Sequence, residues 1–337
     1  MTAGTNGGVA VVAIGRNEGE RLKLCLAAAL RQAPLVVYVD SGSADGSAAM
    51  ARSLGCAVVE LDPARPFTAA RARNEGFARL MERAPHTELV QFIDGDCELE
   101  PGWLQTAAAA LAGREDVGVV CGRVREVSPE ASVYNRMCDL EWRQQPGEIR
   151  SAGGRFMARA GVFKLVDGFR ADVIAAEDDE FCIRVRRAGW KILMLDAPMA
   201  QHDAAISTFS QWWRRNRRAG HAYAQVAALH GRGGERYFVS DQRRILIWGL
   251  ALPVVALALA PFTRGVSLAV LLCIYALQWM HIARGCRRRG WTAREACIYG
   301  GLTVLSRFAA LQGLAIYAWR RRRGKEMTII EYKQVNR

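Results

Sequence analysis

Short apolar runs alternate with segments of helical spacing along the N-terminal part of the chain. Runs of strand length occupy residues 9–14, 35–39 and 57–61, and helical patterns occupy residues 20–31, 44–54 and 68–83. Alternation at such short spacing is typical of βαβ units. The pattern therefore predicts an α/β fold with a mainly parallel sheet and helices on both faces.

The next stretch continues the alternation less regularly. We expect further strands at 89–93, 117–127, 156–158 and 190–200, a turn at 166–169, and helices that begin at Pro101 and that cover 133–142 and 177–189. Residues 144–154 show no period and include Gly153 and Gly154, so they are expected to form a loop that contacts substrate or moves as a lid.

The C-terminal part has a different character. A strongly basic helix is predicted at 207–230, followed by two uncharged apolar runs at 245–262 and 266–283. Each run is close to the roughly 20 residues that cross a bilayer, so both are expected to span a membrane as a hairpin. Arginines flank the hairpin on both sides, which predicts that both flanks face the cytoplasm.

A third apolar run, 296–319, contains Arg307 and is followed by the basic cluster 320–325. Crossing the bilayer would bury Arg307 and carry the cluster to the far side, against the usual distribution of positive charge. We therefore expect an interfacial or re-entrant helix here, followed by a basic cytoplasmic tail.

Net charge supports this division of the chain. The total is +13, but residues 1–211 carry −4 whereas residues 212–337 carry +17. Positive charge beside apolar runs favours a membrane surface as the partner over nucleic acid. The nine cysteines form no CxxC pair, which argues against a disulfide framework or a zinc site and suits a reducing compartment. The polar segment 1–8 shows no signal peptide, so the N-terminal part is expected to face the cytoplasm.

Acidic residues stand where two of the predicted strands end. Asp40 precedes a turn of glycines and serines, and Asp94-Gly95-Asp96 follows the strand at 89–93. Carboxyl ends of parallel strands meet at one edge of a sheet, where ligands bind, and two carboxylates one residue apart can share a divalent cation. Each acid could instead stabilise a turn or cap a helix.

Further candidates lie beyond the strand at 156–158. Four consecutive acids, Glu177 to Glu180, begin a helix; they could cap it, or one could take a proton from an acceptor hydroxyl. His202 could bind a metal or be a satisfied polar residue. Tryptophans beside arginines at 212–218 suit a lipid headgroup interface or an anionic diphosphate.

In order along the chain, these motifs resemble those of the family 2 glycosyltransferases, which have the GT-A fold. The resemblance covers about residues 9–203. It comprises the strand ending in Arg16-Asn17-Glu18, the segment 40–47 after the second strand, the Ala-Arg-Asn-Glu-Gly helix at 72–76, the Asp-x-Asp at 94–96 and the Glu-Asp pair at 177–178. It implies a Rossmann-like mixed sheet with helices on both faces, followed by transmembrane helices.

The resemblance also implies roles for these residues. Donor nucleotide binding would involve Asn17, Glu18, Asp40, Arg71, Arg73 and Asp94; Mn²⁺ or Mg²⁺ would lie on Asp96 and Asp94, with His202 as a further candidate ligand; and Asp178, beside Glu177, would act as general base in an inverting transfer. Candidate contacts of the acceptor and its diphosphate are Gly153, Gly154, Gln211, Trp212, Arg214 and Arg215.

Two positions depart from the family pattern. Ser41 replaces the second aspartate of the family's Asp-Asp-Gly, and Gln211-Trp212-Trp213-Arg214-Arg215 ends in arginine where the processive synthases of the family have tryptophan. With only two expected spans, a single-addition enzyme is favoured over a processive synthase.

The resulting hypothesis is a metal-dependent hexosyltransferase of the bacterial inner membrane that works in cell-surface polysaccharide synthesis, such as exopolysaccharide. Residues 1–205 would form its cytoplasmic catalytic domain, 206–242 a basic interfacial helix and 243–337 the membrane region. Its partners would be a nucleotide-diphosphate sugar, a polyprenyl-diphosphate-linked saccharide, the membrane and other polysaccharide-assembly proteins, with no nucleic acid. Alternatives are transfer to a polyprenyl phosphate, or a non-catalytic scaffold of an assembly complex. A sugar nucleotidyltransferase is disfavoured because residues 16–21 supply no glycine-rich phosphate loop.

Overall fold

The computed structural model describes residues 8–328, which fold into two compact units. The first contains the described residues up to Pro129 together with Cys138–Ala205, and the second contains Glu130–Met137 and the described residues from Ile206 onward. The segment 1–7, on which the absence of a signal peptide was partly inferred, and the end of the basic tail lie outside the described residues.

One mixed sheet forms the centre of the first unit. Its strands follow the order β3-β2-β1-β4-β8-β6-β9-β5, and β7 pairs with β9. Their bounds are β1 (Val9–Gly15), β2 (Val36–Asp40), β3 (Ala57–Glu60), β4 (Leu89–Asp94), β5 (Cys97–Leu99), β6 (Val117–Glu126), β7 (Gly147–Glu148), β8 (Phe156–Arg159) and β9 (Lys191–His202).

The expectation of a mainly parallel sheet holds for only part of it. Strands β3, β2, β1 and β4 are parallel neighbours, as βαβ units require. Strand β8, however, is antiparallel to both β4 and β6, and β5 is antiparallel to β9. The mixed sheet follows because β8 enters between β4 and β6 from a long connection rather than from a βαβ crossover.

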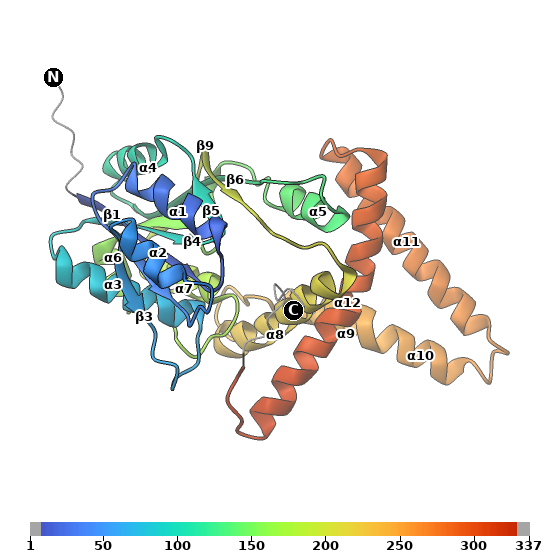
Figure 1. Cartoon of the computed structure of the whole chain (residues 1–337). Helices are drawn as coiled ribbons and strands as arrows, with labels where there is room; N and C mark the ends of the chain where they lie inside the picture. The colour runs from blue at the N-terminus through green and yellow to red at the C-terminus, as the bar shows by residue number, and fades with distance from the viewer. Residues whose placement is uncertain (1–7, 329–337) are drawn as a thin grey trace. The chain divides into compact units, whose positions relative to one another are not determined.

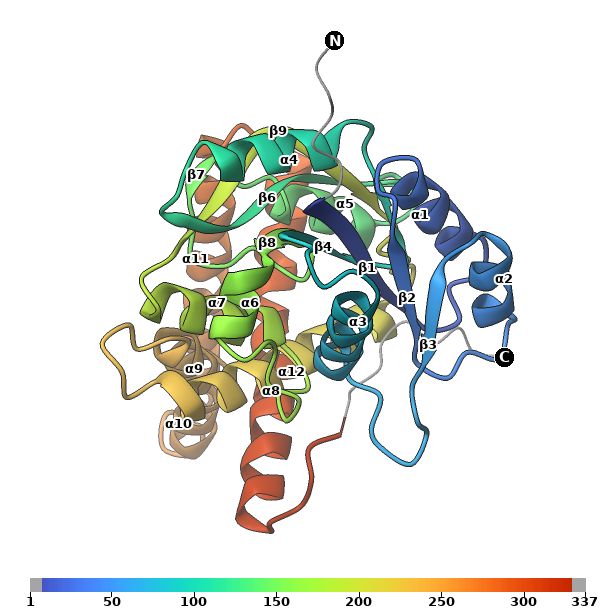
Figure 2. The ribbon, with the colours of Figure 1, turned by 90° about the vertical axis from the view of Figure 1, so that its left-hand side faces the viewer.

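Helices cover both faces of the sheet (Figure 1). The helices of this unit are α1 (Glu20–Leu30), α2 (Ser47–Ser53), α3 (Ala69–Arg83), α4 (Trp103–Ala112), α6 (Ala160–Leu165) and α7 (Glu177–Arg187). In Figure 1, α1 and α4 lie on one side, and α3, α6 and α7 lie on the other. Figure 2 shows α2 beside the outer strands β2 and β3.

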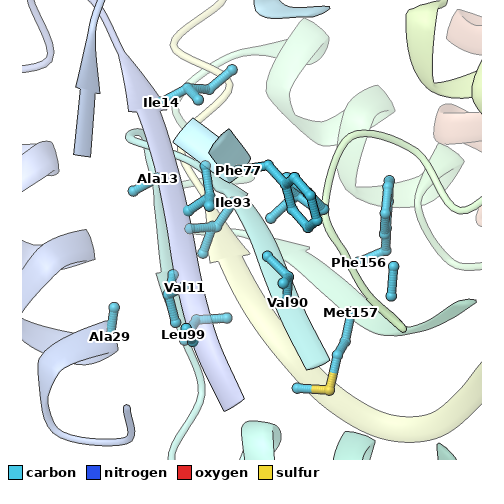
Figure 3. Close-up of a cluster of buried hydrophobic side chains, with 14 of the residues drawn as sticks. Val11, Ala13, Ile14, Ala29, Phe77, Val90, Ile93, Leu99, Phe156 and Met157 are labelled. Carbon is cyan, nitrogen blue, oxygen red and sulfur yellow. The ribbon is translucent and has the colours of Figure 1, made fainter. Parts of the chain in front are cut away.

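The core is a layer of side chains on each side of the sheet. Figure 3 shows Val11, Ala13 and Ile14 of β1 next to Val90 and Ile93 of β4. On the face covered by α3, α6 and α7, aromatic rings pack at centroid distances of 4.3–6.1 Å; they belong to Phe77, Phe92, Phe156, Phe163, Phe169 and Phe181. This cluster fixes the start of α7 against the sheet.

Several local predictions need correction. The helix expected to open at Pro101 begins at Trp103, because Gly102 takes a left-handed φ of 79° and ends the preceding turn. Strand β5 and helix α6 were not foreseen, since three and six residues are too short for a periodic signal. The expected loop 144–154 includes the two-residue strand β7.

The second unit is helical. It contains α8 (Phe209–His230), α9 (Val239–Leu246), the π-helical η2 (Ile247–Ala251), α10 (Leu252–Leu259), α11 (Val266–Arg288) and α12 (Ala293–Arg322), and the first residues of α5 (Val133–Glu141) also belong to it. Figure 1 shows α10 and α11 as a hairpin that extends away from α12.

Helices α8 and α12 approach closely where both carry glycine. A Cβ on Gly220 would lie 2.0 Å from the carbonyl oxygen of Ala310, and one on Gly313 would lie 1.9 Å from that of Arg217. Any larger residue at these positions would force the helices apart. Between these two positions of α12, Gln312 accepts a hydrogen bond from the indole of Trp213 at 3.0 Å.

Three stretches are long and apolar enough to cross a membrane: Val239–Leu259, Val266–Arg288 and Ala293–Arg322. The first two contain the expected hairpin spans. Length and composition also admit the third, which the charge pattern predicts to be interfacial or re-entrant.

Candidate active site

The strand register brings the sequence motifs to one edge of the sheet. Gly15 of β1 pairs with Asp40 of β2, and Ile14 pairs with Asp94 of β4. The ends of three neighbouring strands are therefore level. The order in which strands are added to the sheet also reverses here, because β2 lies on one side of β1 and β4 on the other, and ligands of open α/β sheets bind at such switch points.

Asp40 is buried and organises the turn that follows it. Its carboxylate accepts hydrogen bonds from the Tyr38 hydroxyl at 2.8 Å and from the backbone N–H groups of Gly42 and Ser43 at 3.0 and 2.8 Å. Asn17 joins this turn to the end of β1, because its side-chain oxygen accepts from the N–H of Ala44 at 2.7 Å. These contacts fit the interpretation of Asp40 as a residue that stabilises a turn.

Arg73 connects the two acidic motifs. Its guanidinium donates to Asp94 and to Glu177, each at 2.7 Å, although Glu177 is 104 positions further along the chain. Arg73 is 2 % exposed and its Nε has no hydrogen-bond partner among the described residues. Removing one member of a buried ion network leaves uncompensated charge, at a cost of about 3–5 kcal/mol. Arg73 therefore fixes the start of α7 relative to β4.

The glycine pair of the 144–154 loop packs against this network. A Cβ on Gly154 would lie 2.4 Å from Arg73 Nη2, and one on Gly153, which has a φ of 68°, would lie 3.9 Å from Asp178 Oδ2. The backbone at Gly154 can approach Arg73 only because a side chain is absent there, whereas at Gly153 the positive φ favours glycine.

Asp178 follows Glu177 in the first turn of α7. Desolvation, followed by the negative charges of Asp179 and Glu177, raises the pKa of Asp178 from 3.8 to about 7, while Arg73 acts in the opposite direction. No ion pair joins this carboxyl to a basic side chain within residues 8–328. A carboxylate with a pKa near neutrality is suited to accept a proton from a substrate.

A second cluster surrounds Asp96. Cys97 and His202 are paired across β5 and β9, and potential ligand atoms of Asp96, Cys97 and His202 lie within 4.8 Å of one another. His202 Nε2 is 3.3 Å from Asp96 Oδ2. Burial and the charge of Asp96 raise the pKa of Cys97 well above its usual value, so its thiol is neutral and donates to Asp96 Oδ1 at 3.3 Å.

Arg155 is a residue of this cluster that the sequence analysis missed. Its Nη1 lies 3.0 Å from His202 Nδ1 and 3.9 Å from Asp94 Oδ2. Trp142 stacks on the His202 ring at a centroid distance of 4.5 Å and also contacts the Arg155 guanidinium. Since a guanidinium can only donate, Nδ1 of His202 accepts and Nε2 carries the proton toward Asp96.

Two predicted donor residues are engaged elsewhere in the first unit. Arg71 bonds Glu75 at 2.6 Å and backbone carbonyls of residues 62 and 65 at 3.0 Å, which holds the loop after β3. Glu18 pairs with Arg21 at 2.7 Å. In these contacts both side chains maintain the local structure, and their role toward the donor remains a prediction.

The predicted acceptor residues of α8 belong to the second unit. Gln211 forms a capping box with Thr208, so it stabilises the start of the helix. Trp212 is 5 % exposed and packs against Tyr134 and Phe209. Arg214 is half-buried and its Nε has no hydrogen-bond partner among residues 8–328.

Comparison with known proteins places this site in context. The model of the family "Glycosyl transferase family 2" matches residues 10–166. Glycosyltransferase AglE of Haloferax volcanii is 25 % identical over 226 residues, which cover 63 % of this chain and 72 % of that protein.

Solved structures share the fold at lower identity. Mannosyltransferase PcManGT of Pyrobaculum calidifontis, in complex with GDP-Man and Mn²⁺, superposes with a TM-score of 0.62 at 18 % identity, covering 93 % of this chain and 88 % of that one. Residues 1–349 of TarS from S. aureus give a TM-score of 0.52 at 15 % identity, covering 94 % and 92 %.

Proposed function

We propose that this chain, whose residues 10–166 match the model of glycosyltransferase family 2, is a family 2 glycosyltransferase that takes a sugar from a nucleotide-sugar donor and transfers it with inversion to a hydroxyl group of a lipid-linked saccharide at the membrane surface. The observation that carries the proposal is the contact of one buried guanidinium, that of Arg73, with both Asp94 and Glu177. This contact joins the donor-binding edge of the sheet to the start of the helix that presents Asp178.

Asp178 supports a hydroxyl acceptor over a phosphate acceptor. A sugar hydroxyl must lose its proton as it attacks, and a neighbouring carboxylate with a pKa of about 7 can accept it. A polyprenyl phosphate is already ionised at neutral pH and requires no base. Attack from the side opposite the leaving diphosphate gives inversion at the anomeric carbon.

The chemistry of the second cluster suits Mn²⁺ or Mg²⁺. Asp96 and His202 would hold the ion, because carboxylate oxygen and imidazole nitrogen are ligands of Mn²⁺ and the two atoms are 3.3 Å apart. When bound, the ion supplies positive charge that neutralises the diphosphate of the donor. PcManGT, which has a similar fold, was solved with GDP-Man and Mn²⁺, which supports a divalent ion as the partner of the donor.

The hydrogen bond of Arg155 adds a constraint. His202 can coordinate through Nε2 only when its proton lies on Nδ1, and that tautomer cannot accept the present hydrogen bond from Arg155. With an ion on Nε2 of His202, Arg155 would therefore have to turn away from His202. Its guanidinium can then bond the diphosphate oxygens, for which arginine geometry is well matched.

The second unit would bring the enzyme to its acceptor. We assign the acceptor's diphosphate to Arg214 and Arg215, beside the interfacial Trp212. Both ends of α12 support a membrane-surface position for that helix: Glu295 pairs with Arg136 at 2.6 Å, and Arg321 and Arg322 line the same groove as Arg232. A helix that spanned the bilayer would need partners on opposite sides of it. Membrane attachment then rests on the α9–α11 hairpin, with the first unit on the cytoplasmic side.

Turnover with a panel of donors tests the proposal. The membrane-embedded chain is incubated with GDP- and UDP-sugars, Mn²⁺ and a lipid extract, and nucleoside diphosphate release is measured with product analysis. We expect release with one donor class and a lipid product whose new linkage resists mild acid, as a glycosidic bond does. Absence of release with every donor would contradict the transferase role, and an acid-labile sugar phosphodiester would favour a polyprenyl phosphate acceptor.

A further inference from the structure

A groove of about 700 Å³ lies within the second unit, between α8, α9 and α12. Its floor is made of small and aliphatic side chains, which include Ala224, Ala227, Leu314 and Ala318. This volume lies within the range of small-molecule sites. The floor offers no charged group to a ligand, so it suits a hydrocarbon chain.

Three arginines line the same groove: Arg232 after α8, and Arg321 and Arg322 at the end of α12. All three are exposed, and none forms an ion pair with another described residue. Within the described part of the chain, no acidic side chain lines the groove. Three like charges brought together by separate helices repel one another, so an anionic group bound among them would be stabilised.

The surroundings of the groove are those of a bilayer interface. Leu246, on its wall, is 39 % exposed and continues into exposed Ile247 and Leu250 of the first apolar stretch. Beside it on α12, the exposed Trp319 is contacted by Arg323 and Lys325 at 5.5 and 5.0 Å from the ring centre. Tryptophan and basic residues concentrate at the depth of lipid headgroups. A ligand here would have its anionic group at that depth and its apolar part on the floor.

The groove is separate from the proposed acceptor contacts. Arg214 and Arg215 lie in the first two turns of α8, whereas the groove begins at Ala224. Ten residues of helix correspond to about 15 Å, which is too far for one diphosphate to reach both sets of arginines. A ligand bound in the groove would therefore be a different molecule from the acceptor.

We propose that this groove binds one anionic phospholipid, with its phosphate among Arg232, Arg321 and Arg322 and an acyl chain on the alanine floor. The site does not depend on the proposed transfer reaction. A bound lipid would hold the end of α12 against α9, with which the first apolar stretch begins. The stability of the second unit would then depend on the lipid composition of the membrane.

Lipid retention measured by native mass spectrometry tests this. The full chain is reconstituted in nanodiscs of phosphatidylcholine and phosphatidylglycerol, released into mild detergent and analysed for bound lipid. We expect one retained phosphatidylglycerol. In the variant Arg232→Gln/Arg321→Gln/Arg322→Gln, the amount of retained phosphatidylglycerol should fall at least fivefold. Ala227→Phe, which fills the floor of the groove without changing its charge, should reduce retention by the same factor.

The matched control is Arg284→Gln/Arg288→Gln/Arg289→Gln, which removes the same charge from exposed positions at the end of α11. Retention of phosphatidylglycerol by this control would support a specific binding site in the groove. Equal loss in both triple variants would show general surface attraction and overturn the proposal. It would also be overturned if phosphatidylcholine were retained equally well, or if added polyprenyl phosphate displaced phosphatidylglycerol from the groove.

Discussion

Neutralising Asp179 should move the pH dependence of transfer to lower pH. The pKa of Asp178 is raised from 3.8 to about 7, first by desolvation and then by the charge of Asp179. In Asp179→Asn the burial remains and one neighbouring negative charge is lost. The pKa of Asp178 should then fall, and the base should be ionised over a wider range of pH.

The size of the effect depends on how much each cause contributes to the raised pKa of Asp178. Desolvation is the largest of the causes, and a like charge at close range near a protein surface contributes roughly one pKa unit. With a pKa of about 6 in place of 7, about half of the base is ionised at pH 6 instead of about a tenth. The ratio kcat/KM at pH 6, relative to its value at pH 8, should therefore rise about fivefold.

The assay is the pH profile of kcat/KM for the acceptor at saturating donor and Mn²⁺, which reports ionisations of the enzyme before the acceptor binds. Each profile is normalised to its own plateau, so a change in the strength of the base does not affect the midpoint. The control is Asp172→Asn, which removes an exposed carboxylate paired with Arg170 ahead of the same helix. A midpoint that stays fixed or moves upward in Asp179→Asn would refute Asp178 as the general base.

Three further variants test the rest of the site. Arg73→Gln removes the positive charge that lowers the pKa of Asp178, so the midpoint should move upward while Tm falls; an unchanged midpoint would exclude the electrostatic link. Gly154→Ala should displace the Arg73 guanidinium and lower kcat about 100-fold. As a control, Gly161→Ala should leave kcat unchanged, because a Cβ there meets no described atom within 4 Å. A kcat of Gly154→Ala equal to that of the parent chain would show that the close approach of Gly154 to Arg73 is not required. His202→Ala should weaken Mn²⁺ binding, followed by electron paramagnetic resonance, at least about tenfold, with exposed His86→Ala as control; equal affinity would remove His202 from the ligand set.

Local pattern was sufficient for the parts of the fold that depend on neighbouring residues. The alternation of apolar runs and helical segments identified β1 to β4 and their helices because each βαβ unit is defined by its own sequence. The level alignment of Asp40 and Asp94 follows from the same logic, since parallel strands end at a common edge. The place of β8 between β4 and β6 depends on packing between distant segments, which no local period records.

The sequence likewise reveals some residues of the candidate site and not others. Asp96 and Asp178 stand out because of the residue types beside them. The contact between Arg73 and Glu177 joins positions 104 residues apart, and Arg155 follows a glycine pair with no periodic signal around it. Its position beside His202 emerges only when β8 and β9 are assembled in one sheet. The available signal for this residue was an arginine that directly follows the glycine pair of the predicted loop.

The Asp178→Asn variant isolates the role of this carboxylate in sugar transfer. The substitution keeps the size of the side chain and removes its ability to accept a proton. With the donor that supports turnover, we expect nucleotide binding within a factor of about three of the parent chain, measured by calorimetry, and a fall in sugar transfer of about 100- to 10,000-fold. Undiminished transfer by Asp178→Asn would contradict the role of Asp178 as general base.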